Sequence, residues 1–204
     1  MIDSLDDLVR YSEEVAKASP LISKKVQIVR PGCQPEVVAA LRQLLPGLPE
    51  SYLSVAESIA IDGIVIGYFN LTPGLPRARI TEKLRVSNDP VMAPMAERFR
   101  QHGVYQVASW EADPICVTHT AGMFEIGQLV MYNVGMPAEP PVVLADSFEQ
   151  LLLIAGNLQE IGDKYDEPAR ALGEFRAYLA PLVAGRKDDM ESTWTQIAGV
   201  VLGK

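Results

Sequence analysis

The stretch that decides the fold is Val104-Tyr105-Gln106-Val107-Ala108-Ser109-Trp110-Glu111-Ala112-Asp113-Pro114-Ile115-Cys116-Val117-Thr118. Its two halves, 104–109 and 114–118, are rich in β-branched and aromatic residues, which favour strands. Between them, Glu111-Ala112-Asp113 is prone to form a turn. We therefore predict two short antiparallel strands joined by a tight connection.

Further strands are expected on both sides of this pair. Downstream, Glu125 to Tyr132 and Pro141 to Leu144 read as strands, separated from their neighbours by Thr120-Ala121-Gly122 and Gly135-Met136-Pro137. Together these segments predict an antiparallel meander. Upstream, the run from Ile64 to Phe69 predicts a strand that is buried on both faces and lies near the centre of the sheet.

Helices are predicted before and between these strands. The first follows the cap candidates Asp3 and Ser4, the second begins at Pro35, and the third follows Pro49. The segment from Arg77 to Asn88 is weakly helical in its pattern. A further helix is expected to begin at Pro90 and to end before Gly103, with these residues turned inward: Met92, Met95, Ala96 and Phe99.

The C-terminal part of the chain reads as helical. Ser147-Phe148-Glu149-Gln150 has the form of a capping box, in which the hydroxyl and the amide side chain satisfy backbone N–H groups reciprocally. Pro168 opens the next helix, and the last is marked by Trp194, Ile197, Ala198 and Val201. The segment from Asn157 to Glu167 reads as a junction to this helical tail.

The order of helices, then strands, then helices lacks the βα alternation of a doubly wound sheet, so the class is α+β with a mainly antiparallel sheet. At 204 residues one domain is expected over 1–204. Within it we predict N-terminal helices at about 4–60, a sheet-rich middle at about 63–145 and C-terminal helices at about 147–204.

The charge composition limits which classes of partner we expect. The net charge is −8, and Lys and Arg occur at most in pairs such as Lys24-Lys25, so nucleic acid is not expected. The acidity fits either ordinary solubility or steering towards a basic protein.

The longest uncharged run, 63–76, is broken by Gly and Pro and is too short to span a bilayer, for which about 20 apolar residues are needed. With two distant cysteines and no basic leader, we expect a cytoplasmic protein that does not enter the membrane.

Catalytic chemistry finds little support. Of the two histidines, His102 falls in the last turn of its predicted helix, where it complements the helix dipole. His119 and Cys116 are three apart on a strand and so point to opposite faces, which argues against a nucleophile and base pair and against a metal site. Phosphate-binding glycine loops are absent from the sequence. We therefore expect neither an enzyme nor a cofactor nor a bound metal.

Acidic residues near the first turn leave three interpretations open. Glu111 and Asp113 follow Trp110, and Glu125 is placed on a nearby strand. The cluster is a solvated turn, an acid and base pair of an unrecognised hydrolase, or the rim of a protein-binding surface. For the last interpretation the predicted contact residues are Trp110, Glu111, Asp113 and Tyr132, which combine aromatic anchors with charge.

Three stretches resemble the SUKH superfamily, which includes bacterial immunity proteins and fungal regulators of cell-wall assembly. They are Leu48-Pro49-Glu50-Ser51-Tyr52, similar to its L-P-x-x-Y helix opening; 107–116, similar to its strand, acidic turn and strand, followed by Gly127-Gln128-Leu129-Val130; and 142–152, similar to a strand that runs into an S-F-x-x-L-L helix. The resemblance covers Leu48 to Leu158. This chain has Ala60-Ile61-Asp62-Gly63 where family members often have paired glycines, and the helical tail lies outside the resemblance.

The resemblance implies a SUKH-like, curved antiparallel sheet flanked by helices, here with extra C-terminal helices. It also implies a non-enzymatic protein-binding module, in bacteria typically an immunity protein that neutralises a toxin. A basic toxin domain would suit the negative charge of the chain, and an intracellular regulatory scaffold is the alternative. The sequence leaves open whether the chain is a monomer or a homodimer, and whether the tail packs on its own sheet or on a second copy.

Overall fold

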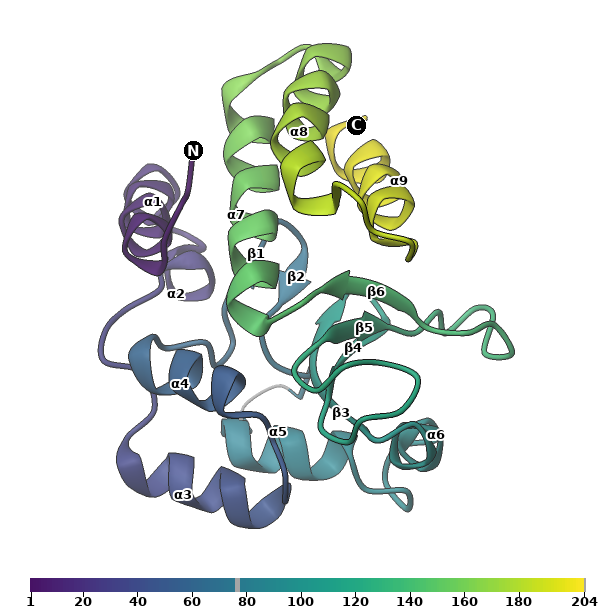
Figure 1. Cartoon of the computed structure of the whole chain (residues 1–204). Coiled ribbons are helices and arrows are strands. Elements are labelled where there is room, and N and C mark those ends of the chain that lie inside the picture. The colour runs from purple at the N-terminus through teal and green to yellow at the C-terminus, as the bar shows by residue number, and fades with distance from the viewer. Residues whose placement is uncertain (76–77, 204) are drawn as a thin grey trace.

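The computed structural model describes residues 1–75 and 78–203 and contains an open antiparallel sheet (Figure 1). The sheet follows chain order without a crossover, and each strand pairs antiparallel with the next. The strands in the described residues are β1 (Val65–Ile66), β2 (Phe69–Asn70), β3 (Val104–Trp110), β4 (Asp113–Thr118), β5 (Leu129–Met131) and β6 (Val142–Ala145). The predicted α+β class and the antiparallel meander are confirmed.

Helices flank this sheet on several sides. Figure 1 shows α7, α8 and α9 standing together above the sheet, with α3 and α5 below it and α1 and α2 beside α7. Their bounds are α1 (Leu5–Ala18), α2 (Ser23–Val26), α3 (Pro35–Leu44), α4 (Glu50–Ser58), α5 (Ile80–Ser87), α6 (Ala96–Gln101), α7 (Phe148–Lys164), α8 (Pro168–Val183) and α9 (Met190–Leu202). None of the helices in the described residues is long and apolar enough to cross a bilayer.

The predicted helix starts are largely confirmed. Ser4 caps α1 by accepting the Asp7 N–H, and Ser147 caps α7 by accepting the Gln150 N–H at 3.1 Å. The reciprocal bond of the capping box is displaced by one residue, because the Gln150 side chain accepts the N–H of Asp146 rather than that of Ser147. Pro35 and Pro168 occupy the first turns of α3 and α8, where a missing N–H costs nothing.

The predicted central strand at 64–69 is wrong. The run folds back on itself as the β1–β2 hairpin, and β1 forms an edge of the sheet. Gly67 and Tyr68 form its two-residue turn, with φ of 50° and 73°. Two positive φ values in a two-residue loop suit the right-handed twist of a hairpin, and Gly67 within the apolar run was the signal for it.

Two helical boundaries also differ from the prediction. The helix expected from Pro90 begins at Ala96, because 90–95 forms turns, and Met92 is 55% exposed. Gly103 follows α6 with a φ of 65°, as expected of a residue just beyond a helix. In the weakly helical segment, Arg77 lies outside the described residues and α5 begins at Ile80.

The segment from Asn157 to Glu167 is not a junction, because α7 continues through Lys164. Asn157 is fully buried in this helix, and its amide makes hydrogen bonds to both backbone groups of Ile2, with Asn157 Oδ1 accepting the Ile2 N–H at 2.9 Å and Nδ2 donating to the Ile2 carbonyl at 2.7 Å. The buried polar side chain of Asn157 is therefore explained by the N-terminal segment that it binds.

Two core clusters lie against the sheet. The larger one joins residues of the N-terminal helices, the sheet and the C-terminal helices, and it includes Tyr52, Phe69, Phe148, Phe175 and Trp194. The smaller one gathers Ala96, Phe99, Val104, Cys116, Val130, Tyr132 and Val143 between α6 and the strands. Since successive side chains of a strand point to opposite faces, both faces of β4 and β5 are buried.

The edge strand β6 is closed by α9. Ala145 pairs with Leu129 and Val143 with Val130, so Leu144 is the extra residue of a β-bulge. The Trp194 indole Nε1–H donates to the Leu144 carbonyl at 2.7 Å, and the Asp189 carboxylate accepts the Val143 N–H at 3.3 Å. The helical tail therefore packs on the sheet of its own chain.

Replacing Trp194 by Phe is expected to lower the free energy of unfolding by about 2–4 kcal/mol. The change deletes a buried hydrogen bond, leaves the Leu144 carbonyl without its donor and opens a void under α9. Urea unfolding followed by circular dichroism measures the loss.

Trp110→Phe is the matched control for this change. It removes the same atoms, but the Trp110 indole N–H is buried without a hydrogen-bond partner among the described residues. The expected loss is about 1 kcal/mol or less, because no bond is broken and an unsatisfied donor is removed. Equal losses in the two variants would contradict the role assigned to the Trp194 indole.

Candidate functional site

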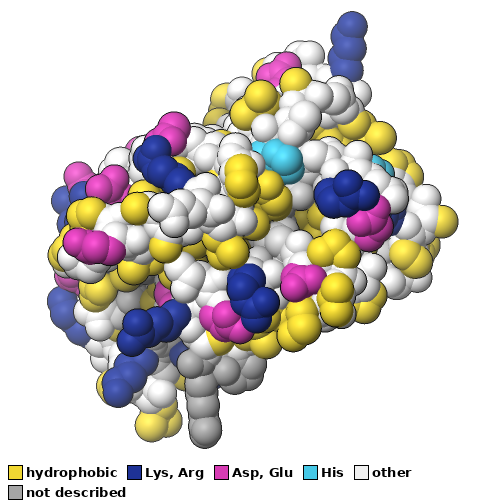
Figure 2. Space-filling model, turned by 90° about the horizontal axis from the view of Figure 1, so that it is seen from below, with side chains coloured by type: hydrophobic (Ala, Val, Ile, Leu, Met, Phe, Trp, Pro, Cys, Tyr) yellow, Lys and Arg dark blue, Asp and Glu magenta, His cyan; other side chains and the backbone are white. Residues whose placement is uncertain are grey.

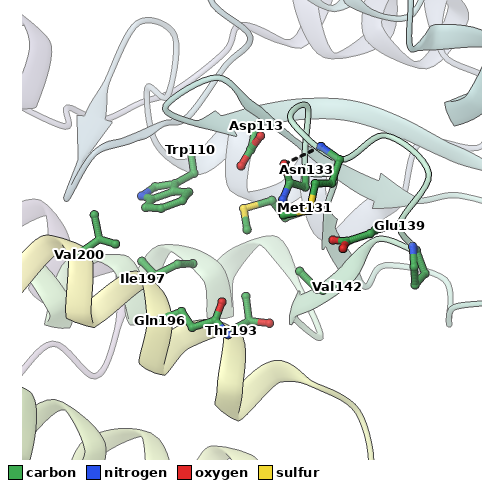
Figure 3. Close-up of a pocket in the computed structure, with 12 residues that line it drawn as sticks. Trp110, Asp113, Met131, Asn133, Glu139, Val142, Thr193, Gln196, Ile197 and Val200 are labelled. Carbon is green, nitrogen blue, oxygen red and sulfur yellow. Dashed lines mark hydrogen bonds between the residues drawn. The ribbon is translucent and has the colours of Figure 1, made fainter.

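A cavity of about 300 Å³ lies between the end of the sheet and α9 (Figure 3). We call it the acidic pocket. On the sheet side its wall comes from the ends of β3 to β6 and from the β5–β6 loop: Trp110, Asp113, Met131, Asn133, Met136, Glu139, Pro140 and Val142. On the helix side its wall is one face of α9: Thr193, Gln196, Ile197 and Val200.

The β3–β4 turn places the first group of pocket residues. Trp110 and Asp113 form the last pair of the β3–β4 ladder, so both side chains stand at the same end of the sheet. Asp113 Oδ1 accepts the N–H of Val134 at 2.8 Å and so ties this turn to the β5–β6 loop. Between them Glu111 has a φ of 50°, a left-handed conformation that favours glycine.

Arg98 of α6 holds the β5–β6 loop in place from outside the pocket. Its guanidinium donates to the carbonyl oxygens of Pro137 and Glu139, and it lies over the Tyr132 ring at 5.2 Å from the centroid. Within the loop, Asn133 Oδ1 accepts the N–H groups of Gly135 and Met136. The loop wall is thus fixed by hydrogen bonds before any ligand arrives.

An aromatic row connects the pocket to the core. Phe69 lies opposite Trp110 in the β2–β3 ladder, with ring centroids 6.4 Å apart, and Phe69 and Trp194 are 5.4 Å apart. The Trp110 ring is only partly buried and lines the cavity. A displacement of α9 would therefore be transmitted to the pocket wall through the packed rings of Trp194, Phe69 and Trp110.

The pocket carries negative charge. Asp113 and Glu139 line it, and Glu111 stands exposed on the adjacent turn. Among the described residues, the side chains of Glu111 and Glu139 have no hydrogen bond or ion pair, and Asp113 uses only Oδ1. The described lining includes no Lys or Arg, so this charge is uncompensated at the cavity surface.

The four predicted contact residues do not all meet. Trp110 and Asp113 line the acidic pocket together, and Glu111 lies exposed between them in sequence. Tyr132 is 1% exposed and belongs to the smaller core cluster, with its ring 5.0 Å from that of Phe99. Burial raises the pKa of the Tyr132 hydroxyl. As placed, its side chain offers no surface to a partner.

The remaining pocket residues were missed by sequence reasoning. Met131 and Met136 lie at and beyond the end of β5, and Gln196, Ile197 and Val200 lie on α9. The apolar spacing on α9 indicated a core-facing stripe, which Trp194 and Ile197 do form. The sequence held no signal that one flank of this stripe would face the end of the sheet.

The acid and base trio of the hydrolase interpretation is not assembled. Glu111 and Asp113 lie at the start of β4, whereas Glu125 lies in the loop beyond its last residue, Thr118. Six residues of extended strand separate the two ends by about 17–20 Å. Glu125 therefore cannot share a substrate atom with the other two carboxylates.

The histidines and cysteines have structural contacts. Cys116 is fully buried, which raises the pKa of its thiol. His119 stacks on Tyr105 with ring centroids 4.0 Å apart, and His102 is the C-cap residue of α6 and bonds through Nδ1 to the Tyr132 hydroxyl at 2.8 Å. Burial lowers the pKa of both imidazoles. In the described part of the chain, no group of three or more His, Cys, Asp or Glu could hold a metal ion.

The surface beyond the pocket mixes both signs of charge. Figure 2 shows basic and acidic side chains interspersed with apolar ones on the face seen from below. Short ion pairs of this kind join Arg100 to Glu97 and Arg42 to Glu50, at 2.6 and 2.7 Å.

Searches of protein-family models, curated proteins and solved structures find no match to this chain.

Glu111→Gly is expected to leave the free energy of unfolding unchanged or to raise it by up to about 1 kcal/mol. Glycine adopts a positive φ without the steric cost that Glu111 bears, although it also makes the unfolded chain more flexible. Thermal unfolding checks this result. A loss above about 1 kcal/mol would show that the Glu111 side chain makes a stabilising contact.

Proposed function

We propose that the chain is a non-enzymatic protein-binding module that receives its partner at the acidic pocket. The observation that carries the proposal is the pocket itself, which is preformed between the β3–β4 turn and α9 and combines an aromatic anchor with unpaired carboxylates. Binding energy at protein interfaces concentrates in such partly enclosed places, where a large side chain of one protein is desolvated by the other.

Exposed apolar side chains surround the pocket and support this proposal. Val134 is 43% exposed, Met136 is 53% exposed and Val200 is 47% exposed. Val134 and Met136 lie on the β5–β6 loop and Val200 lies on α9, so the pocket has apolar groups on both sides of its mouth. Methionine and aromatic residues are enriched at interface cores, and polar residues at their rims.

The backbone of Glu111 supplies a second argument. A glutamate there is held in a conformation that glycine would adopt at lower cost, yet its carboxylate makes no hydrogen bond or ion pair within the described residues. Strained residues gather at functional sites, where the strain is tolerated for what the side chain does. We take the exposed carboxylate of Glu111 to contact a basic surface of the partner.

The class of partner follows from the SUKH resemblance and from charge. We infer an immunity protein that acts in the bacterial cytoplasm and neutralises a basic toxin domain by covering part of its surface. The net charge of −8 favours fast association with such a partner. Two of the similar stretches also have a structural role, since Tyr52 of the L-P-x-x-Y helix packs on Phe148 of the S-F-x-x-L-L helix at 4.8 Å.

We expect a toxin-like chain to be encoded beside this protein, and we expect replacement of Trp110 by Ala together with Asp113 by Asn to weaken its binding by about 100-fold or more. Loss of an aromatic anchor and a charged partner commonly costs over 2 kcal/mol at an interface. Isothermal titration calorimetry measures the change, and a growth assay with the toxin measures protection. Unfolding curves of the double variant verify that it folds.

Leu21→Ala with Glu14→Gln is the matched control. It also removes one exposed apolar side chain and one carboxylate, but on α1 and the turn after it, beside α7 and away from the acidic pocket (Figure 1). This variant should bind and protect as the unchanged chain does. Equal loss in both double variants, unchanged affinity in the first, or a neighbouring region that encodes no toxin-like chain would contradict the proposal.

A further inference from the structure

The acidic pocket has two chemically different walls. Met131, Val142 and Ile197 supply apolar surface, while Asp113 and Glu139 supply carboxylates on the sheet and loop side (Figure 3). Trp110 lies at one end of the cavity and Glu139 towards the other. An occupant must therefore have an apolar stem and a positively charged head.

The size of the cavity limits the occupant to one side chain. About 300 Å³ is the lower end of the range for pockets that enclose a small ligand. A helix or a strand of a partner is too wide to enter, whereas one long side chain fits. An apolar side chain would leave the carboxylates desolvated without a partner, which is costly, and an acidic one would be repelled.

Arginine fits these walls better than lysine. The guanidinium is planar and weakly hydrated, stacks on aromatic rings and carries five N–H donors. Here its acceptors are the free Oδ2 of Asp113 and the unpaired carboxylate of Glu139, whereas the Trp110 ring lines the end of the cavity away from Glu139. A lysine ammonium is a compact and strongly hydrated charge that cannot bond two separated acceptors in a plane.

The geometry points to one occupant: an arginine side chain of the partner protein that inserts between the end of the sheet and α9, with its stem on Met131 and Ile197 and its guanidinium at Asp113 and Glu139. This inference rests on the proposed function, because it names the residue that the partner presents to the same pocket. It also explains why the loop wall is held in place by Arg98 from outside, where that guanidinium is occupied by the Pro137 and Glu139 carbonyls.

The test titrates the ¹⁵N-labelled full chain with the blocked tripeptide acetyl-Gly-Arg-Gly-amide and follows both indole N–H signals. The chain has two tryptophans. Trp110 lines the pocket and reports binding, whereas Trp194 is fully buried, bonds to Leu144 and serves as the internal control of folding. We expect a saturable shift of the Trp110 signal alone, which weakens as salt is added.

Three further probes define the chemistry. The corresponding lysine peptide should bind several-fold more weakly, and the citrulline peptide, which has the same shape without the charge, should not saturate the signal. Free L-arginine is the other source of a guanidinium group; it lacks the flanking peptide groups of a protein segment and should bind more weakly than the blocked peptide. A citrulline peptide or free arginine that binds as tightly as the arginine peptide would overturn the inference, as would the absence of a saturable shift.

Substitutions inside and outside the acidic pocket test where the arginine peptide binds. Asp113→Asn with Glu139→Gln should weaken binding of the arginine peptide by about 10-fold or more, since hydrogen bonds between two ionised groups are stronger than bonds to a neutral amide. The asparagine amide oxygen can still accept the Val134 N–H, so the turn is retained. Glu13→Gln with Glu14→Gln on α1 changes the net charge equally and should leave the affinity unchanged. Equal effects of the two pairs would overturn the site.

The two proposals fail in different ways. If the toxin-like chain binds through Trp110 and Asp113 but the arginine peptide causes no shift, the pocket is a protein interface and only the arginine inference is lost. If the peptide binds and the toxin-like chain is insensitive to the same substitutions, the pocket takes a guanidinium group but the proposed function is wrong.

Discussion

The structure depends on the closure of the β6 edge by α9. An edge strand exposes unpaired backbone groups, which other chains can pair with unless they are covered. The bulge at Leu144 turns its carbonyl outward, where the Trp194 indole N–H bonds to it at 2.7 Å, and Asp189 accepts the neighbouring Val143 N–H. The Trp194 ring then packs on Phe69, which packs on Trp110. These two hydrogen bonds and the packing of Trp194 hold α9 against β6, and α9 forms the second wall of the acidic pocket.

The C-terminal helices also hold the β1–β2 turn and the N-terminal segment of the chain. Gln159 of α7 accepts the Gly67 N–H in the β1–β2 turn at 2.9 Å, and Asn157, two residues earlier, binds the backbone of Ile2. The α8–α9 turn is tied to the end of β6 through Arg186, which bonds Asp146 at 2.6 Å and lowers the pKa of that carboxyl. The C-terminal helices are therefore part of the sheet architecture, although the resemblance noted in the sequence ends at Leu158, within α7.

Sequence patterns of a few residues predicted most of the helices and strands but not which of them pack against one another. Alternating β-branched residues located β3 and β4, and capping residues such as Ser4 and Ser147 located helix starts, because these preferences act within a few residues. The burial of Tyr132 and the position of Val200 in the pocket wall depend on which helix covers which face of the sheet. The alternation of residues along a strand does not predict that arrangement. Half of the predicted contact set therefore lines the pocket, while the α9 wall could be found only by folding the chain.

Several unsatisfied groups lie together at one end of the sheet, although the Tyr52 and Thr118 hydroxyls, which are also buried without a partner among the described residues, lie elsewhere. At the β3–β4 turn the structure has a non-glycine residue at positive φ, a buried indole N–H without a partner, and carboxylates without cations. The β6 edge, in contrast, has its Leu144 carbonyl and its Val143 N–H bonded by Trp194 and Asp189. Unpaired backbone groups at the β6 edge would favour aggregation, and there the chain supplies hydrogen-bond partners. At the β3–β4 turn the described residues supply none for the indole N–H and no cation for the carboxylates. We propose that a partner contacts the strained turn and the free charge around Trp110, at a place where stability alone would favour glycine and an ion pair.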